Sequence, residues 1–279
     1  MRQSAPRGVV EKHMEFPVPE YIRSITPYIP GKPINETRRE LGLGPKDPVI
    51  KLASNENSLG PSPKALIAIR KHLTEVHLYP DAYAYELRMA IQDVCGVRSD
   101  QILIGNGSNE VIDLLIRTFC VPGDAMVTTE KAFIAFRICA QIHGVRTIES
   151  LLGPDLRPDL DALLAKVRNE SRARMVFLAN PNNPTGTYVR QRELIEFLNG
   201  VAAIRGGSVI VVLDSAYLEY VDAPDFPDPM EVMKRFGNVV VMRTFSKIYG
   251  LAAMRVGYAI ARTEIVATVE KVRQPFNTG

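Results

Sequence analysis

Lys247 stands among residue types that together could bind a ligand covalently and hold its phosphate group. It follows the apolar run Asn238–Met242, so it is expected just beyond the end of a buried strand. Ser246 precedes it, and Arg255 lies eight residues further on. A lysine amine can form a Schiff base with an aldehyde, and a serine hydroxyl and a guanidinium both bind phosphate. The run therefore predicts a ligand that carries both an aldehyde and a phosphate.

A second candidate for phosphate binding follows an earlier apolar run. Gly105–Glu110 comes directly after the run that ends at Ile104, and a helical pattern begins at Val111. Glycines such as Gly107 allow close approach of the backbone, and the free N–H groups of Ser108 and its neighbours favour an anion at a helix start. The same residues also suit an ordinary turn and helix cap.

Polar residues also follow the next two apolar runs. Asn183 lies in a loop rich in proline, Asn180–Gly186, which is either a rigid turn or a loop that directs the amide into a cleft. Asp214 ends an apolar run, with Tyr217 three residues on. A buried carboxylate is costly without a partner, so Asp214 should face a cation or solvent, or else cap a helix.

These residues require a sheet whose strands end at one edge. Short runs rich in β-branched residues alternate with helical patterns, which predicts an α/β fold with a mostly parallel sheet covered by helices. Ligands bind at the carboxyl ends of the strands in such sheets. The first fifty residues are rich in proline and predict an extended arm with one short helix near 36–41. The expected strands are 101–104, 125–128, 174–178, 208–213, 238–242 and 256–260.

Composition excludes several classes of protein. The chain has 279 residues, of which 46% are hydrophobic and 23% charged, as in ordinary globular proteins. Its net charge of +3 is spread along the sequence, so nucleic acid is not an expected partner. The three cysteines form no CxxC pair, which indicates a reduced cytoplasmic protein without a metal site. The first ten residues open no long apolar segment, so neither a signal peptide nor a membrane anchor is expected.

The joint pattern resembles the fold-type I aminotransferases that use pyridoxal phosphate, and within them the histidinol-phosphate aminotransferases. The similarity covers nearly the whole chain from about Tyr21. The motifs that carry it are Lys51–Asn57, Gly60–Pro63, Tyr79–Asp81, Gly105–Ser108, Asn180–Gly186, Arg243–Lys247 and Arg273–Asn277. The resemblance implies a mostly parallel seven-stranded sheet with helices on both faces. It also implies an arm and part of a small domain in residues 1–50, and a large cofactor-binding domain in residues 51–279.

The same resemblance implies a role for each matching residue. Lys247 would form the Schiff base and later move the substrate proton, while Asp214 would pair with the protonated ring nitrogen of the cofactor. Tyr217 and Asn183 would hydrogen-bond the phenolic oxygen of the ring. The phosphate would be held by Gly107, Ser108, Ser246 and Arg255, and by Tyr79 of the partner subunit. Phe133 would stack on the ring or pack in the core, and Tyr28 and Asn55 would contact the substrate.

The implied reaction is transamination between L-histidinol phosphate and 2-oxoglutarate in histidine biosynthesis, catalysed by a cytoplasmic homodimer. A threonine-phosphate decarboxylase, an aromatic aminotransferase and a noncatalytic cofactor-binding fragment are the alternatives. Asn109, Phe133, Ser58 and Ser215 depart from the commoner residues of the family. The resemblance also implies a C-terminal small domain with an arginine for the substrate, which the sequence up to Gly279 does not include. The sequence is then part of a longer chain, or a truncated product that binds cofactor without turnover.

Overall fold

The computed structural model describes residues 16–278 and contains a central seven-stranded sheet. All six expected strands form, within a few residues of their expected ends. The seventh, β3, was not expected, because its alternation of polar and apolar residues is weak at the edge of the sheet. The strands are β1 (Ile102–Asn106), β2 (Ala125–Thr129), β3 (Arg146–Ser150), β4 (Ala173–Ala179), β5 (Ile210–Asp214), β6 (Val239–Thr244) and β7 (Val256–Ile260).

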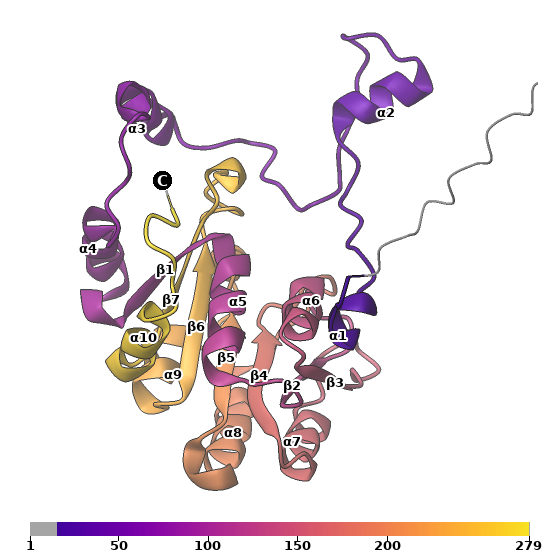
Figure 1. The fold of residues 1–279 in the computed structure, drawn as a ribbon, viewed down its shortest axis with the longest axis vertical. Helices are drawn as coiled ribbons and strands as arrows, with labels where there is room; N and C mark the ends of the chain where they lie inside the picture. The colour runs from indigo at the N-terminus through magenta and orange to yellow at the C-terminus, as the bar shows by residue number, and fades with distance from the viewer. Residues whose placement is uncertain (1–15, 279) are drawn as a thin grey trace, which may run out of the picture.

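The strand order is β1-β7-β6-β5-β4-β2-β3, and β7 alone runs against its neighbours. The prediction of a mostly parallel sheet is therefore confirmed. The parallel strands β4, β5 and β6 are almost entirely buried, as expected for strands that helices cover on both faces. Because β7 is reversed, its first residues lie at the same edge of the sheet as the last residues of β1 and β6 (Figure 1).

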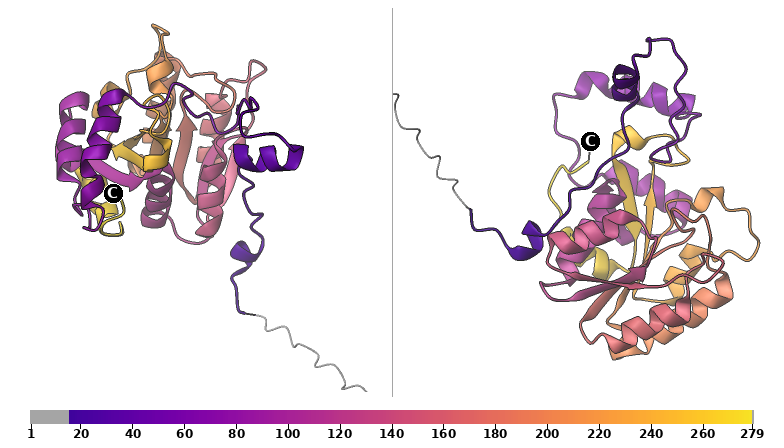
Figure 2. Two further views of the ribbon diagram at one scale, coloured as in Figure 1. Left: turned by 90° about the horizontal axis from the view of Figure 1, so that it is seen from above. Right: turned by 90° about the vertical axis from the view of Figure 1, so that its right-hand side faces the viewer.

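Helices cover both faces of the sheet (Figures 1 and 2). On one face, α5, α6 and α10 pack over Met126, Phe177 and Val240, among other strand residues. On the other face, α4, α7, α8 and α9 pack over Val127, Leu178 and neighbouring residues. The helix bounds are α1 Glu20–Arg23, α2 Ile34–Leu41, α3 Pro63–His72, α4 Tyr85–Cys95, α5 Gly107–Phe119, α6 Ile134–Ile142, α7 Leu160–Asn169, α8 Gln191–Ala202, α9 Pro229–Arg235 and α10 Thr263–Glu270.

Helix α5 begins at Gly107, four residues before the expected start at Val111. Gly107 has a positive φ of 71°, which glycine adopts without the steric penalty of other residues. The helix therefore follows β1 directly, and its first free N–H groups belong to the glycine-containing run itself. Helix α8 begins at Gln191.

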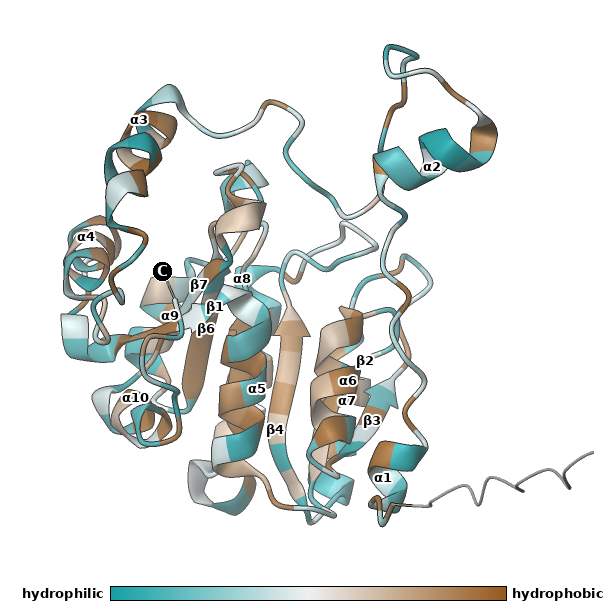
Figure 3. Cartoon of the chain, turned by 45° about the horizontal axis from the view of Figure 1, so that its top comes forward, coloured by the Kyte–Doolittle hydropathy of each residue, from teal (hydrophilic) through white to brown (hydrophobic). Residues whose placement is uncertain are grey.

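The N-terminal segment extends away from the sheet. Helix α2 matches the expected short helix, begins at Ile34, and has no buried residue. Its residues are largely hydrophilic in Figure 3, in contrast to the hydrophobic central strands. The arm also contains α1, which was not expected and which contacts α6. Residues 1–15, on which the expectation about a signal peptide rested, lie outside the described residues.

Two further observations concern the whole described part of the chain. None of the helices in residues 16–278 combines the length and the apolar character that crossing a membrane requires. The thiols of Cys95, Cys120 and Cys139 are all free. Burial raises the pKa of Cys120 and of Cys139 to about 12, so both stay protonated at neutral pH.

Candidate active site

A cavity opens at the edge of the sheet where β1, β4, β5 and β6 end and β7 begins. It collects eight of the side chains singled out in the sequence, which come from five separate segments. Its lining is Ser54, Glu56, Ser108, Asn109, Phe133, Ala179, Pro181, Asn183, Asp214, Ala216, Tyr217, Thr244, Ser246, Lys247, Ala252 and Arg255. This is the edge at which ligands bind in open α/β sheets.

Lys247 lies three residues beyond the end of β6 at Thr244. Its Nζ donates a hydrogen bond of 3.0 Å to the main-chain oxygen of Ser54. The same Nζ lies 5.5 Å from the centre of the Tyr217 ring. Asn57 donates from its amide to the main-chain oxygen of Ile248 at 2.7 Å, so the segment 54–57 packs over the lysine loop. The amine is thereby held over the cavity and away from bulk solvent on one side.

Asp214 is the last residue of β5 and is only 6% exposed. Burial raises the pKa of its carboxyl to about 6, although the N–H of Ala216 and the charge of Lys247 oppose this shift. The carboxylate accepts that N–H at 3.1 Å and joins none of the ion pairs between described residues. The alternative of a helix cap is wrong, because the next helical turn starts at Leu218 and Tyr217, not Asp214, occupies its N-cap position. A cationic ligand group would satisfy Asp214.

Three polar side chains meet beside Asp214. The amide nitrogen of Asn55 donates to the hydroxyl of Tyr217 at 3.0 Å and to Oδ1 of Asn183 at 3.4 Å. Asn55 has a positive φ of 51°, a conformation that asparagine tolerates better than most residues. Asn183 follows the end of β4, in a loop with cis bonds before Pro181 and Pro184. The cluster places a hydroxyl and two amides where they can bind one polar ligand atom.

The opposite end of the cavity has the donors that a phosphate requires. Arg255 directly precedes β7, and its Nη1 lies 3.4 Å from the hydroxyl oxygen of Ser246. A Cβ at Gly107 would lie 2.2 Å from Nη2 of Arg255, so the guanidinium lies directly over the start of α5. A Cβ at Gly257 would lie 2.4 Å from the backbone nitrogen of Ser108, which shows how closely β7 approaches the same turn. A guanidinium, two hydroxyls and helix N–H groups thus converge.

Phe133 lies between the cavity and the core. Its ring lines the cavity and also packs edge-on against Phe136 in the core, with ring centres 5.8 Å apart. Phe136 is fully buried, and its ring supports the Phe133 ring on the side of the core. A flat aromatic ligand could stack on the exposed face of Phe133.

Tyr79 and Tyr28 do not line the cavity. Tyr79 is 82% exposed and packs on Phe276 with ring centres 4.8 Å apart, whereas Tyr28 is 60% exposed on the arm. Neither residue is among those that line the cavity of this chain.

The sequence patterns did not single out several groups that line or order the cavity. The main-chain oxygen of Ser54 and the N–H of Ala216 are backbone groups, which residue type does not reveal. Glu56 lies in the Lys51–Asn57 motif, and its carboxylate accepts from Lys51 at 2.8 Å. The hydroxyl of Thr244 accepts a hydrogen bond from the N–H of Ser246 at 3.1 Å. The position of Thr244 at the end of β6 is the sequence feature that could have indicated this residue.

The donor set fits a ligand with an aldehyde, a cationic ring nitrogen and a phosphate. Lys247 supplies an amine, Asp214 a buried carboxylate that lacks an ion-pair partner, and Arg255 a guanidinium over the start of α5. Because residue 107 is a glycine, the Arg255 guanidinium can lie where a Cβ would otherwise clash with it. Residues 16–278 contain no group of three His, Cys, Asp or Glu side chains that could hold a metal ion. Pyridoxal phosphate meets all the requirements of the cavity.

Known proteins share this arrangement over most of the chain. The model of the family described as aminotransferase class I and II matches residues 47–278. A histidinol-phosphate aminotransferase from Anaeromyxobacter is 50% identical over 94% of this chain, which spans 69% of that protein. A second such enzyme, from Pseudomonas fluorescens, is 44% identical over 92% of the chain, which spans 67% of it.

The structural comparison agrees. The crystal structure of histidinol-phosphate aminotransferase from Sinorhizobium meliloti in complex with pyridoxal-5'-phosphate superposes with a TM-score of 0.82 at 28% identity. The match covers 93% of this chain and 66% of that one. The expected fold class is therefore confirmed. The chain belongs to the class I and II aminotransferases and, within them, to the histidinol-phosphate aminotransferase family.

Proposed function

We propose that the protein uses pyridoxal phosphate to transaminate L-histidinol phosphate with 2-oxoglutarate, which yields imidazole acetol phosphate and L-glutamate. The observation that supports this most directly is the cavity itself. It places Lys247, Asp214 and Arg255 around one space, in a chain that is 50% identical to a histidinol-phosphate aminotransferase. In the biosynthetic direction the reaction forms L-histidinol phosphate, and a step of this kind belongs to histidine biosynthesis.

The residues would hold the cofactor at its phosphate and at its ring nitrogen. Arg255, Ser246, Ser108 and the N–H groups at the start of α5 would bind its phosphate, since all of them converge at one end of the cavity. Asp214 would bind the protonated ring nitrogen; burial disfavours its lone charge, so a cation is its best partner.

The other contacts would orient the ring. Tyr217, Asn183 and Asn55 would surround its phenolic oxygen or the substrate, and Phe133 would lie against one face of the ring. When bound, pyridoxal phosphate supplies an aldehyde for amines and a ring that accepts the electrons of a substrate carbanion.

Lys247 would carry out the proton transfers. Its Nζ makes one hydrogen bond, to a main-chain oxygen at 3.0 Å, so it can exchange that contact for the cofactor and the substrate. Once the substrate amine has replaced it, the freed Nζ would take the proton from the substrate Cα and deliver it to the carbon that had carried the cofactor's aldehyde. Tyr217 lies near enough to keep the amine over the cavity.

We further propose a homodimer in the cytoplasm. Tyr79 and Tyr28 are exposed and lie outside the cavity of their own chain, so each could serve the site of a partner. The three free thiols support a reducing compartment. We assign residues 1–50 to the arm and part of a small domain, and residues 51–279 to the large domain, because the described sheet and its covering helices all lie in the second range.

The test is a half-reaction with purified protein and stoichiometric pyridoxal phosphate. A visible absorption band should form, and borohydride treatment should fix the cofactor covalently to Lys247 as located by mass spectrometry. Addition of L-glutamate should abolish the band and release one 2-oxoglutarate per site; imidazole acetol phosphate should then restore it and yield L-histidinol phosphate.

The same experiment separates the alternatives. A Lys247→Ala variant should keep the fold and lose the band, with Lys271→Ala, an exposed lysine, as its control. Carbon dioxide release from threonine phosphate without amino transfer would favour the decarboxylase. A normal band without any half-reaction would favour a noncatalytic cofactor-binding fragment, and no band at saturating cofactor would exclude the proposal.

A further inference from the structure

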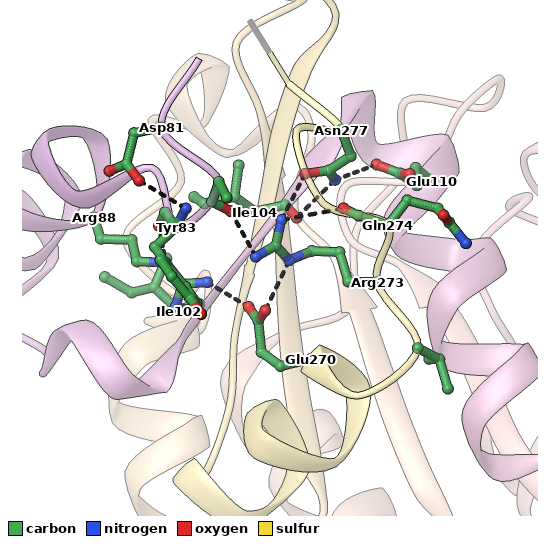
Figure 4. A network of polar contacts seen from close by, with 12 residues as sticks. Asp81, Tyr83, Arg88, Ile102, Ile104, Glu110, Glu270, Arg273, Gln274 and Asn277 are labelled. Atoms are coloured by element: carbon green, nitrogen blue, oxygen red, sulfur yellow. Dashed lines mark hydrogen bonds and ion pairs between the residues drawn. The ribbon is translucent and has the colours of Figure 1, made fainter. Parts of the chain in front are cut away.

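The segment Glu270–Asn277 lies between the start of α5 and the loop that carries Tyr79, and it bonds to both (Figure 4). It follows α10 and is not part of the cavity lining. Its motif was noted in the sequence only for its similarity to the family. The contacts of this segment, which we call the brace (residues 270–277), indicate a specific task.

One end of the brace holds the phosphate-binding turn. The amide nitrogen of Asn277 donates to Oε2 of Glu110 at 2.6 Å and to the main-chain oxygen of Ile104 at 3.4 Å. The same Oε2 accepts the N–H of Asn106 at 2.5 Å. Asn106 occupies the N-cap position of α5 and directly precedes Gly107. Asn277 is therefore connected, through the side chain of Glu110, to the backbone that would bind the cofactor phosphate.

The other end of the brace holds the loop that carries Tyr79. Arg273 donates to the main-chain oxygen of Ala82 at 2.9 Å, and Phe276 packs against the ring of Tyr79 itself. Asp81 accepts the N–H groups of Tyr83 and Tyr85, which closes this loop onto α4. The position of Tyr79 relative to the sheet thus depends on Arg273 and Phe276.

Arg273 connects the two ends. Its side chain is only 6% exposed, and it donates to Oδ1 of Asn277 and to Glu270 at 2.7 Å each. Glu270 also pairs with Arg88, which donates in turn to the main-chain oxygens of Tyr83 and Ile102. A buried guanidinium with this many fixed acceptors has little rotational freedom, and loss of one partner would leave polar groups without hydrogen bonds.

We propose that Arg273 and Asn277 are positioning residues that hold the phosphate-binding turn of α5 and the Tyr79 loop in fixed positions relative to each other. The inference rests on the proposed function, since it assigns the turn to the phosphate of pyridoxal phosphate. Neither residue lines the cavity. Each acts through a second residue: Asn277 through Glu110, and Arg273 through Asn277 and Ala82. Their effect should depend on the phosphate group of the ligand.

The experiment compares pyridoxal phosphate with pyridoxal, which has the aldehyde and the ring but no phosphate. Dissociation constants are measured by the visible band for the wild-type protein and for the Asn277→Ala and Arg273→Gln variants. The expected result is a Kd for pyridoxal phosphate that rises about tenfold or more, as for one lost hydrogen bond to a charged group. The Kd for pyridoxal should change by no more than about twofold.

A charge-swapped pair tests the Asn277–Glu110 contact itself. Glu110→Gln and Asn277→Asp should each weaken phosphate-dependent binding, because the first replaces a charge-assisted hydrogen bond by a weaker neutral one and the second places two carboxylates together. The double variant restores one amide opposite one carboxylate. Its Kd for pyridoxal phosphate should return to within about threefold of wild type, which general loss of stability would not produce.

Arg172→Gln serves as the matched control for Arg273→Gln. Arg172 also donates to a carboxylate, that of Asp124 at 3.1 Å, and to a main-chain oxygen, that of Pro122. It lies near the amino ends of β2 and β4, at the opposite edge of the sheet. Melting temperatures are recorded for all variants, and Arg273→Lys replaces Arg273→Gln if the latter does not fold.

The outcomes separate this inference from the proposed function. Normal binding of pyridoxal phosphate by every brace variant, with a wild-type protein that binds and turns over, would overturn the inference alone. An equal loss of affinity for pyridoxal and for pyridoxal phosphate would also overturn the inference, because the brace would then be a general stabilising element. A wild-type protein that binds neither ligand would overturn the proposed function and the inference together.

Discussion

The guanidinium of Arg255 lies so close over Gly107 that a Cβ at position 107 would be 2.2 Å from Nη2. The two residues are 148 positions apart in the sequence, and they meet because β1 and β7 are neighbours in the sheet. Their contact defines the end of the cavity where a phosphate would bind. It also provides the first prediction.

Gly107→Ala should weaken binding of pyridoxal phosphate by about tenfold or more, because the new methyl group displaces Arg255 and its charge-assisted hydrogen bonds. The positive φ of 71° should cost a further ~1–2 kcal/mol of stability. Gly96→Ala is the control, since Gly96 has a φ of 63° and no atom within 4 Å of its built Cβ. Titration of both variants measures the effect; equal affinities would contradict it.

Asp214 should make the cofactor-free protein less stable as pH rises. Its pKa is raised from 3.8 to about 6, so the folded state binds more protons than the unfolded state between these values. Stability is therefore lost as pH rises from about 4 to about 6, by roughly 3 kcal/mol at 1.36 kcal/mol for each pKa unit. Asp214→Asn should remove this loss in urea unfolding at pH 4 and pH 7. Parallel pH dependences for the two proteins would exclude this role.

The same substitution should have the opposite effect on the loaded protein. With cofactor bound, Asp214→Asn leaves a buried cation without its partner, which typically costs about 3–5 kcal/mol. The half-reaction with glutamate should slow by about a hundredfold or more. Stopped-flow absorbance measures the rate, and a loss below about threefold would show that Asp214 does not pair with the ring.

Asn55 and Tyr217 should be energetically coupled. Asn55→Gly removes the amide that donates to Tyr217 at 3.0 Å, and glycine accepts the φ of 51° without strain. Tyr217→Phe removes the other partner. In a double-mutant cycle on kcat/KM, the coupling should be about 0.5–1.5 kcal/mol, as for one hydrogen bond. Additive effects would mean that the contact does not persist during turnover.

Tyr79 should act in the site of the partner subunit. Lys247→Ala and Tyr79→Ala chains should each be nearly inactive alone. Mixed and allowed to exchange, they should regain about a quarter of wild-type activity, because half of randomly formed C2 dimers contain one intact site of two. Sedimentation gives the oligomeric state. No recovery in confirmed mixed dimers would place Tyr79 in the site of its own chain, or outside any site.

Much of the fold was predictable because the parallel strands are buried on both faces. Runs such as Val239–Met242 have no polar interruption, so they are recognisable without context. The edge strand β3 cannot be recognised in this way, because it contains the exposed charged residues Arg146 and Glu149. The reversal of β7 could not be predicted from alternation of strands and helices, since it depends on the short connection after β6.

The sequence predicted which strand ends would form the cavity, but it did not predict the hydrogen bonds between the residues there. Lys247, Asp214 and Asn183 lie within four residues of the ends of their strands, so the topology of the sheet was enough to bring them together. The bond between Asn277 and Glu110 joins residues 167 positions apart, and no periodicity signals it. Backbone partners such as Ser54 and Ala216 depend on local dihedral angles, which residue type constrains only weakly.

The antiparallel pairing of β7 with β6 makes the chain between them a closed hairpin. Thr244 pairs with Gly257, and the N–H of Phe245 donates to Val256 at 3.1 Å, so the base of the hairpin is fixed by ladder hydrogen bonds. Lys247 and Arg255 both lie within it. The residues proposed to attach the cofactor covalently and ionically therefore belong to a single hairpin, and its base is closed by these hydrogen bonds.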